Sequence, residues 1–111
     1  MPREKFQALT EQMFYILLSL RDECCGMDIM TKVDQLTRGR VKVGPGTLYN
    51  LLEQFAAAGF IRQTRVEGRR RSYILTGQGR DALEEEFRRI CHQVDDYRRF
   101  FGEEDGNEAK A

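Results

Sequence analysis

Three consecutive arginines, Arg69, Arg70 and Arg71, are the side chains of this sequence with the most specific chemistry. Each guanidinium stays charged at neutral pH and offers paired donors that match phosphate oxygens. Successive side chains of a strand point to opposite faces, so the three arginines cannot all cover one apolar surface. Only Glu67 is close by in the sequence. The triplet therefore indicates contact with a phosphate backbone, and a solvated loop that aids solubility is the alternative.

A helix is expected shortly before the arginines, over residues 45–58. Pro45 suits a first helical turn after Gly44 as the cap, and Gly59 can adopt the left-handed conformation that ends a helix. Apolar residues recur at steps of three and four and form one buried stripe: Leu48, Leu51, Leu52 and Phe55. The other faces carry groups suited to phosphates and base edges: Thr47, Tyr49, Asn50 and Gln54. Taken alone, this segment also fits an ordinary amphipathic helix.

A small β-hairpin is expected to present the arginines. Residues 60–66 and 71–75 are rich in β-branched and aromatic side chains, and Glu67-Gly68 between them is a turn signal. The alternation of apolar and polar residues is imperfect, so a loop longer than two residues is compatible with the pattern. A helix that leads into an arginine-tipped hairpin is typical of a DNA-binding unit.

The charge is distributed unevenly along the chain. The formal net charge is zero, which taken as a whole would argue against a polyanionic partner. From Arg38 to Arg80, however, nine basic residues stand against two acidic ones, whereas from Asp81 onward ten acidic residues stand against five basic ones. A positive centre between acidic ends is the electrostatic pattern of an oriented nucleic-acid-binding molecule.

The remaining elements complete a mainly α fold with a small β-hairpin. Helices are expected over residues 10–21 and 26–37, and the linker 38–44 leads into the helix at 45–58, so that the second and third helices form a helix-turn-helix. With the hairpin this gives a winged helix-turn-helix DNA-binding domain over residues 1–75. A long C-terminal dimerisation helix over 76–101 and a disordered acidic tail over 102–111 follow.

The C-terminal helix carries an apolar seam. Its members recur at alternating steps of four and three, as in a coiled coil, and are Leu83, Phe87, Ile90, Val94, Tyr97 and Phe101. A single helix that extends past a winged core has little of that core left to cover, so we expect a homodimer. Packing against its own domain is the alternative.

The sequence offers little for catalysis, metal binding or membrane insertion. His92 is the only histidine, and Cys24, Cys25 and Cys91 lack the spacing of a zinc site. We therefore expect no enzyme activity, no cofactor and no metal. Structural thiols in a reducing compartment are favoured over a redox sensor. No apolar run approaches a membrane span and no signal peptide is evident, which predicts a cytoplasmic protein.

A small aromatic or apolar effector is a further hypothesis. The helix at 10–21 is apolar nearly all round, and its surplus face is expected to meet the partner's C-terminal helix. Four aromatic side chains are predicted to line a ligand cavity there, with Phe101 close by: Phe14, Tyr15, Phe87 and Tyr97. The alternative is that these rings simply fill the interface. Cys91 beside the seam is a candidate oxidation point.

At this level of detail the sequence resembles the short class of PadR-family transcriptional regulators. The matching stretches are LTEQMFYILLSL, GMDIMTKV, GPGTLYNLL and GRRRSYILTGQGR, which together span about residues 9–100 with the helix that follows them. The resemblance implies a bacterial homodimeric repressor that an effector or signal releases from operator DNA. It also implies that a defined set of positions lies at the DNA: Lys42, Gly46, Thr47, Tyr49, Asn50, Arg69, Arg70 and Arg71.

Some short members of this family bind flat aromatic compounds between tryptophans from the two C-terminal helices. This chain has no Trp, and Ile90 stands at the matching position, so the same stacking is not expected. A winged-helix adaptor for protein partners is the competing function. Such an adaptor should show an apolar patch where this sequence has basic residues.

Overall fold

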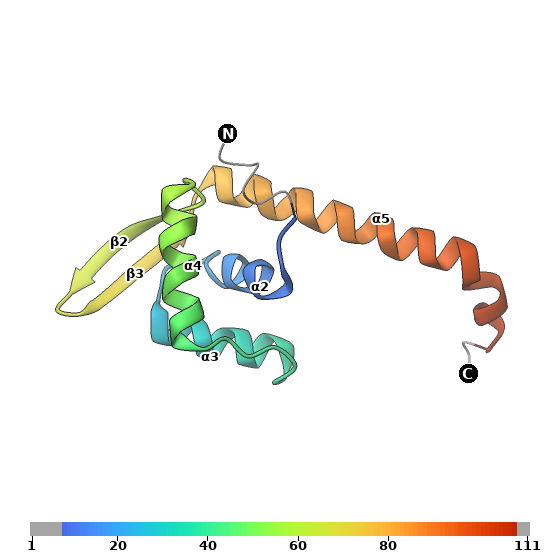
Figure 1. The fold of residues 1–111 in the computed structure, drawn as a ribbon, viewed down its shortest axis with the longest axis horizontal. Coiled ribbons are helices and arrows are strands. Elements are labelled where there is room, and N and C mark those ends of the chain that lie inside the picture. The colour runs from blue at the N-terminus through green and yellow to red at the C-terminus, as the bar shows by residue number, and fades with distance from the viewer. Residues whose placement is uncertain (1–7, 109–111) are drawn as a thin grey trace.

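The computed structural model describes the backbone of residues 8–108 and the side chains of residues 8–102. Four helices and a three-stranded antiparallel sheet make up this part of the chain. The helices are α2 (Glu11–Ser19), α3 (Gly26–Thr37), α4 (Pro45–Ala57) and α5 (Gly77–Glu108). The strands are β1 (Cys24–Cys25), β2 (Ile61–Glu67) and β3 (Arg70–Leu75). Figure 1 shows that the hairpin and the far end of α5 extend from opposite sides of the helical body.

The winged helix-turn-helix fold expected from the sequence is confirmed. Its core lies where α2, α3 and α4 meet the base of the sheet and the first turns of α5, and its largest fully buried side chains include Phe55 and Phe60. The two rings lie 6.2 Å apart between centroids. The apolar stripe of α4, from Leu48 to Phe55, is buried as its spacing predicted.

The helix ends follow from their local chemistry. Thr10 Oγ1 accepts the backbone N–H of Met13 at 3.2 Å and caps α2. α3 ends in left-handed residues, with φ of 54° at Arg38 and 78° at Gly39. Thr76 Oγ1 accepts the N–H of Gly79 at 3.0 Å at the start of α5. A Cβ at Gly79 would collide with the Phe60 carbonyl oxygen, so this glycine lets α5 lie close against the core.

The sheet differs from the expected hairpin in two ways. Its strand order is β1-β3-β2, and β1 is a short third strand that pairs Cys24 with Tyr73. The hairpin loop is Gly68-Arg69, because Glu67 still pairs with Arg70, and Gly68 has the positive φ (63°) that a tight turn requires. The turn is therefore shifted by one residue from the expected Glu67-Gly68. The register shift between Gln63 and Arg65 accounts for the imperfect alternation.

The long C-terminal helix continues beyond the expected boundary at residue 101 and ends at Glu108. The proposed division at residues 101 and 102 and the disorder of the acidic tail stay predictions, and residues 109–111 of that tail lie outside the described part of the chain. Leu83, the first member of the predicted seam, is 9% exposed and belongs to the core of its own domain. The reason is that the first turns of α5 cover α2, so the exposed part of the seam begins at Phe87.

A buried carboxylate fixes α5 to the chain before α2. Glu86 is 4% exposed, accepts the Leu9 N–H at 3.2 Å and forms a hydrogen-bonded ion pair with Arg89. The hydrogen bond from Arg89 lowers the pKa of Glu86, burial opposes this shift, and the Leu9 N–H supports it. Because the pKa is lower in the folded state, the carboxylate stabilises the fold above its unfolded pKa, and this contribution is lost as the pH falls through the folded pKa.

Glu86→Gln is therefore expected to lower the free energy of unfolding at pH 7 by about 1–3 kcal/mol, as for other broken hydrogen bonds to charged groups. The difference from the wild type should shrink as the pH falls below about 4, because the wild-type carboxyl is then protonated as well. Urea unfolding at pH 7 and pH 3 measures both values. A difference that is equal at the two pH values would contradict this role of the charge.

Candidate nucleic-acid interface

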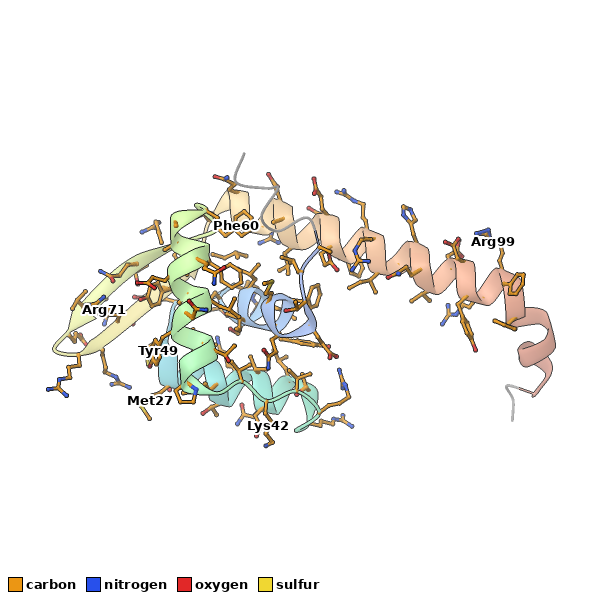
Figure 2. All side chains as sticks on the ribbon, viewed as in Figure 1. Met27, Lys42, Tyr49, Phe60, Arg71 and Arg99 are labelled. Carbon is orange, nitrogen blue, oxygen red and sulfur yellow. The ribbon has the colours of Figure 1, made fainter. Side chains whose placement is uncertain are left out.

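A groove runs between α4 and the hairpin. Its volume is about 920 Å³, and α4, the start of α3 and both long strands contribute to its wall. The hydrogen-bonding and cationic side chains in this wall include Tyr49, Asn50, Gln63, Tyr73, Arg69, Arg70 and Arg71, and Glu53 is the one acidic residue of the lining. Figure 2 shows Tyr49 on α4 facing the side on which Arg71 stands on the hairpin. The groove thus joins the two halves of the predicted DNA-binding unit.

The exposed face of α4 carries the predicted groove contacts. Thr47, Tyr49 and Asn50 are exposed in the first two turns, where backbone N–H groups lack helical partners and favour anions. A Cβ built on Gly46 would meet no atom within 4 Å, so open space surrounds this position. A ligand of the groove could therefore approach the backbone of α4 closely here.

Tyr49 has a neighbour that the sequence did not reveal. A Cβ at Gly26 would lie 2.6 Å from the Tyr49 hydroxyl oxygen. The tyrosine ring therefore lies against the first residue of α3, although half of its surface remains exposed. Gly26 leaves room for the ring, which fixes the hydroxyl at the edge of the groove. The only signal in the sequence for this contact is the glycine at the start of α3, and glycine occurs at many helix starts without such a role.

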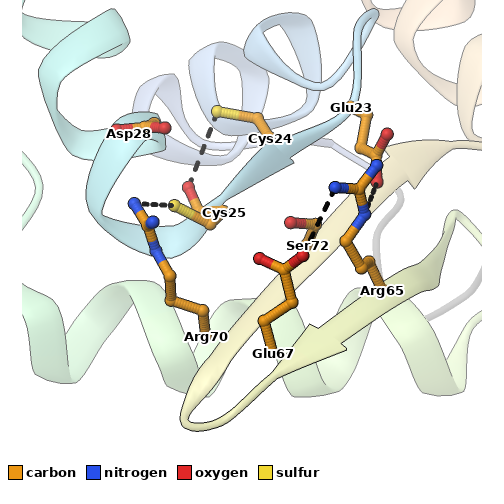
Figure 3. Close-up of a pocket in the computed structure, with 8 residues that line it drawn as sticks. All are labelled: Glu23, Cys24, Cys25, Asp28, Arg65, Glu67, Arg70 and Ser72. Atoms are coloured by element: carbon orange, nitrogen blue, oxygen red, sulfur yellow. Dashed lines mark hydrogen bonds and ion pairs between the residues drawn. The ribbon is translucent and has the colours of Figure 1, made fainter.

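The three arginines occupy different places on the hairpin. Arg69 is in the turn, whereas Arg70 and Arg71 are strand residues, which corrects the expectation that all three form the tip. Arg70 Nη2 donates to Cys25 Sγ at 3.7 Å and points toward the base of α3 (Figure 3). Arg69 and Arg71 form no ion pair with any side chain that the structure describes. Their charges are therefore available to a phosphate.

Lys42 lies apart from the groove, in the linker before α4 (Figure 2). Its Nζ is 2.9 Å from Asp34 Oδ1, and its carbonyl accepts a hydrogen bond from Gln12 at 3.0 Å. In the same linker, Arg40 donates to the Tyr15 hydroxyl at 3.0 Å. Side chains of α2 thus tie the linker in place and so set the position of α4.

A second, polar pocket lies between the outer half of the hairpin, next to its turn, and the start of α3 (Figure 3). Glu23 contacts the hairpin here. Its Oε2 accepts a hydrogen bond from the Thr64 hydroxyl at 2.6 Å and lies 3.7 Å from Arg65 Nε. Arg65 also pairs with Glu67 at 3.5 Å. These contacts connect the segment before β1 to β2 and so orient the hairpin relative to α3.

The predicted ligand-lining residues do not come together in one chain. Phe14 and Phe87 line a hollow of about 270 Å³ between α2 and α5. Tyr15, however, contacts Arg40, and Tyr97 lies next to Phe101 with 5.3 Å between ring centroids. Tyr97 is ten residues beyond Phe87, or about 15 Å along a helix. A cavity with all four rings would therefore need a second chain.

The cysteines differ in exposure: Cys24 and Cys25 are buried and Cys91 is exposed. Burial raises the pKa of the Cys24 thiol. Among the described residues, no group of three or more His, Cys, Asp or Glu side chains is arranged to hold a metal ion. The helices within the same range include none that is long and apolar enough to span a bilayer.

The fold and the groove define a winged-helix protein of the DNA-binding class. Residues 16–85 match the transcriptional regulator PadR-like family, and the chain belongs to this family. Its members are DNA-binding transcriptional regulators rather than enzymes, in agreement with the sequence. A comparison with curated proteins gave no significant match.

Solved structures support the same fold at low identity. The complex structure of hsRosR-S4 has a TM-score of 0.68 and 22% identity, covering 100% of this chain and 98% of that one. A transcriptional regulator from Clostridium thermocellum has a TM-score of 0.61 and 17% identity, covering 81% of this chain and 87% of that one. NadR in complex with 4-hydroxyphenylacetate has a TM-score of 0.61 and 18% identity, covering 98% of this chain and 74% of that one.

Proposed function

We propose that this protein is a sequence-specific repressor that binds operator DNA as a homodimer and leaves it when an effector binds. The observation that carries the proposal is the groove between α4 and the hairpin. The groove lining contains three arginines and one acidic residue. The arginines lie opposite the polar face of α4, and the backbone at Gly46 in the first turn of α4 has open space around it. Cations arranged along one concave face suit a phosphate backbone. The lining also includes apolar Met27, Leu52 and Ala56, so the preference for DNA over a protein-binding adaptor rests on the three arginines.

The groove residues divide into two kinds of DNA contact. Arg69 and Arg71, which have no ion-pair partner within the described side chains, neutralise phosphates. Tyr49 donates its hydroxyl to a phosphate from the position that Gly26 leaves open. Thr47 and Asn50 read base edges, since an amide is suited to bidentate recognition of adenine. Lys42 contacts the DNA backbone outside the groove. Its ammonium group leaves the Asp34 carboxylate and binds a phosphate instead.

Asn50→Ala tests the assignment of base reading. If Asn50 contacts a base edge, its loss should cost about 1–3 kcal/mol on the operator and leave binding to random DNA nearly unchanged. Fluorescence anisotropy with both duplexes at one salt concentration measures the two affinities. His92→Ala, an exposed site on α5, serves as a control that should alter neither. Equal losses on operator and random DNA would make Asn50 a positioning residue instead.

The homodimer is proposed from the exposed apolar side of α5. Phe87 is 56% exposed, Val94 43%, Tyr97 59% and Phe101 42%. A contiguous row of this kind on a helix that extends beyond its own domain is typical of an interface. A two-fold axis through α5 would present two copies of α4 to successive major grooves, about 34–36 Å apart.

The effector is proposed to act where α2 of one chain meets α5 of the other. The NadR structure contains an aromatic ligand, 4-hydroxyphenylacetate, and the corresponding ligand class here is a small aromatic or apolar molecule. Such a ligand releases DNA only if it prefers the arrangement that does not bind DNA. The ties from α2 to the linker before α4, through Gln12 and Tyr15, provide a physical connection from this junction to the DNA-binding helix.

A further inference from the structure

We propose that a second copy of this chain docks antiparallel along α5 in one defined register, and that the hollow between α2 and α5 receives Phe101 of that copy. The inference rests on the homodimer of the proposed function and deepens it by naming the orientation, the register and the residues that select them. Three independent features of the described chain support it: the hollow, the aromatic end of α5 and the charges beside the seam.

The hollow is an apolar recess with a charged rim. Its wall is formed by Phe14 and Leu18 of α2, Leu75 at the end of β3, and Leu83 and Phe87 of α5. The rim residues are Arg21, Arg80 and Glu84. At about 270 Å³ the recess suits one large side chain from outside, because its apolar lining gains little from holding water.

The complementary part is the far end of α5. Tyr97 and Phe100 both contact Phe101, with ring centroids 5.3 Å and 5.0 Å from it. Phe100 is 81% exposed and Phe101 42% exposed. Exposed aromatic rings bury a large area when a partner covers them. The same helix therefore carries an unfilled apolar recess near its start and an uncovered aromatic cluster near its end.

The seam spacing gives the register that joins these two ends. The seam residues alternate between the a and d positions of a heptad, and in an antiparallel pair each a residue lies opposite a d residue of the partner. Ile90 then lies opposite the partner's Val94, and Phe87 lies opposite the partner's Tyr97. The next layer places the partner's Phe101 opposite Leu83. Because Leu83 lines the hollow, this register brings Phe101 to the recess, and no seam residue is left without an apolar neighbour.

Charge complementarity selects the antiparallel orientation. Glu84 and Arg98 each follow a seam residue and so flank the seam on the same side, and an antiparallel pair brings equal flanks together. Glu84 then lies beside the partner's Arg98, at the rim of the hollow. Among the side chains that the structure describes, Glu84 forms an ion pair only with Arg88, at 3.9 Å, and Arg98 forms none. A parallel pair would place uncharged Gly79 and Gln93 beside these two residues instead.

Cysteine pairing between two variants tests the register. Glu84→Cys and Arg98→Cys, each combined with Cys91→Ser, are coexpressed, purified and treated with a mild diamide-type oxidant. One thiol from each chain forms the disulfide, while two protons and two electrons pass to the oxidant. We expect a covalent dimer from the mixture that forms at least about tenfold faster than from either variant alone. Cys24 and Cys25 are buried and should not take part.

Arg99→Cys in place of Arg98→Cys is the matched control, because Arg99 pairs with Asp96 of its own helix and lies on the outer side of α5. It should not cross-link to Glu84→Cys. Equal cross-linking of the two pairs, or none while sedimentation shows a wild-type dimer, would overturn the register but leave the homodimer standing. A wild-type monomer at micromolar concentration would overturn the homodimer as well.

Phe101→Ala tests the occupant of the hollow. If Phe101 fills the recess, its removal should weaken dimerisation by about tenfold or more, because two recesses per dimer lose an aromatic side chain. Phe100 is not a seam residue, so Phe100→Ala should weaken dimerisation less than Phe101→Ala does. Unchanged dimerisation in Phe101→Ala would contradict the proposal and leave the recess open to a small apolar molecule.

Discussion

The protein in which Arg69, Arg70 and Arg71 are all replaced by alanine is expected to lose most of its DNA affinity at physiological salt. Each bound phosphate releases condensed counterions, so the slope of log K against log salt should flatten by about one for each arginine removed, or about three for the triple variant. The loss should be similar on operator and random duplexes, because phosphates carry no sequence information. Anisotropy titrations from about 50 to 200 mM salt measure the slope.

The single variants refine this prediction. Arg69→Ala and Arg71→Ala should each flatten the slope by about one. Arg70 already contacts Cys25 Sγ, so Arg70→Ala distinguishes a phosphate contact from a bond within the domain. Arg88→Ala on the exposed side of α5 is the control for the change in net charge. A triple variant with the wild-type slope would remove the hairpin from the DNA interface.

The double variant Ile90→Asp with Val94→Asp is expected to abolish the dimer. It would place four carboxylates in an apolar interface, and uncompensated buried charges cost several kcal/mol. Leu83 and the buried core are untouched by these changes, so the winged domain should keep its helical circular dichroism while operator binding is lost. Sedimentation equilibrium measures the oligomeric state.

His92→Asp serves as the control for this double variant, because His92 lies between the two sites in sequence but off the seam. It should remain dimeric. An intact dimer in the double variant would move the interface away from the middle of α5. Loss of the helical signal together with the dimer would show that the domain depends on its partner for folding.

The sequence predicted most of the fold because its signals are local. Gly44 and Pro45 set the start of α4, Gly59 has the positive φ of 83° expected after its end, and Thr76 caps α5. The apolar spacing of α4 identified its buried face. Each of these features depends on residues within one or two helical turns, so it can be recognised without knowledge of the tertiary structure.

The features that the sequence missed depend on distant contacts. β1 has two residues, too few for a recognisable pattern, and exists only because β3 offers Ser72 and Tyr73 as partners. The Tyr49 ring meets Gly26 across two helices. Leu83 fits the seam by spacing but is covered by its own domain. In each case the outcome is decided by tertiary packing, which the periodicity of one segment does not contain.

The most direct test of DNA recognition is salt-titrated binding of the wild-type protein to the DNA upstream of its own coding region, since regulators of this kind commonly act there. We expect saturable binding at least about 10³-fold tighter than to random duplex at physiological salt, with a steep salt dependence on both. Equal affinity for the two duplexes would contradict sequence-specific recognition at this site. Binding that does not change with salt would contradict the cationic groove as the DNA interface.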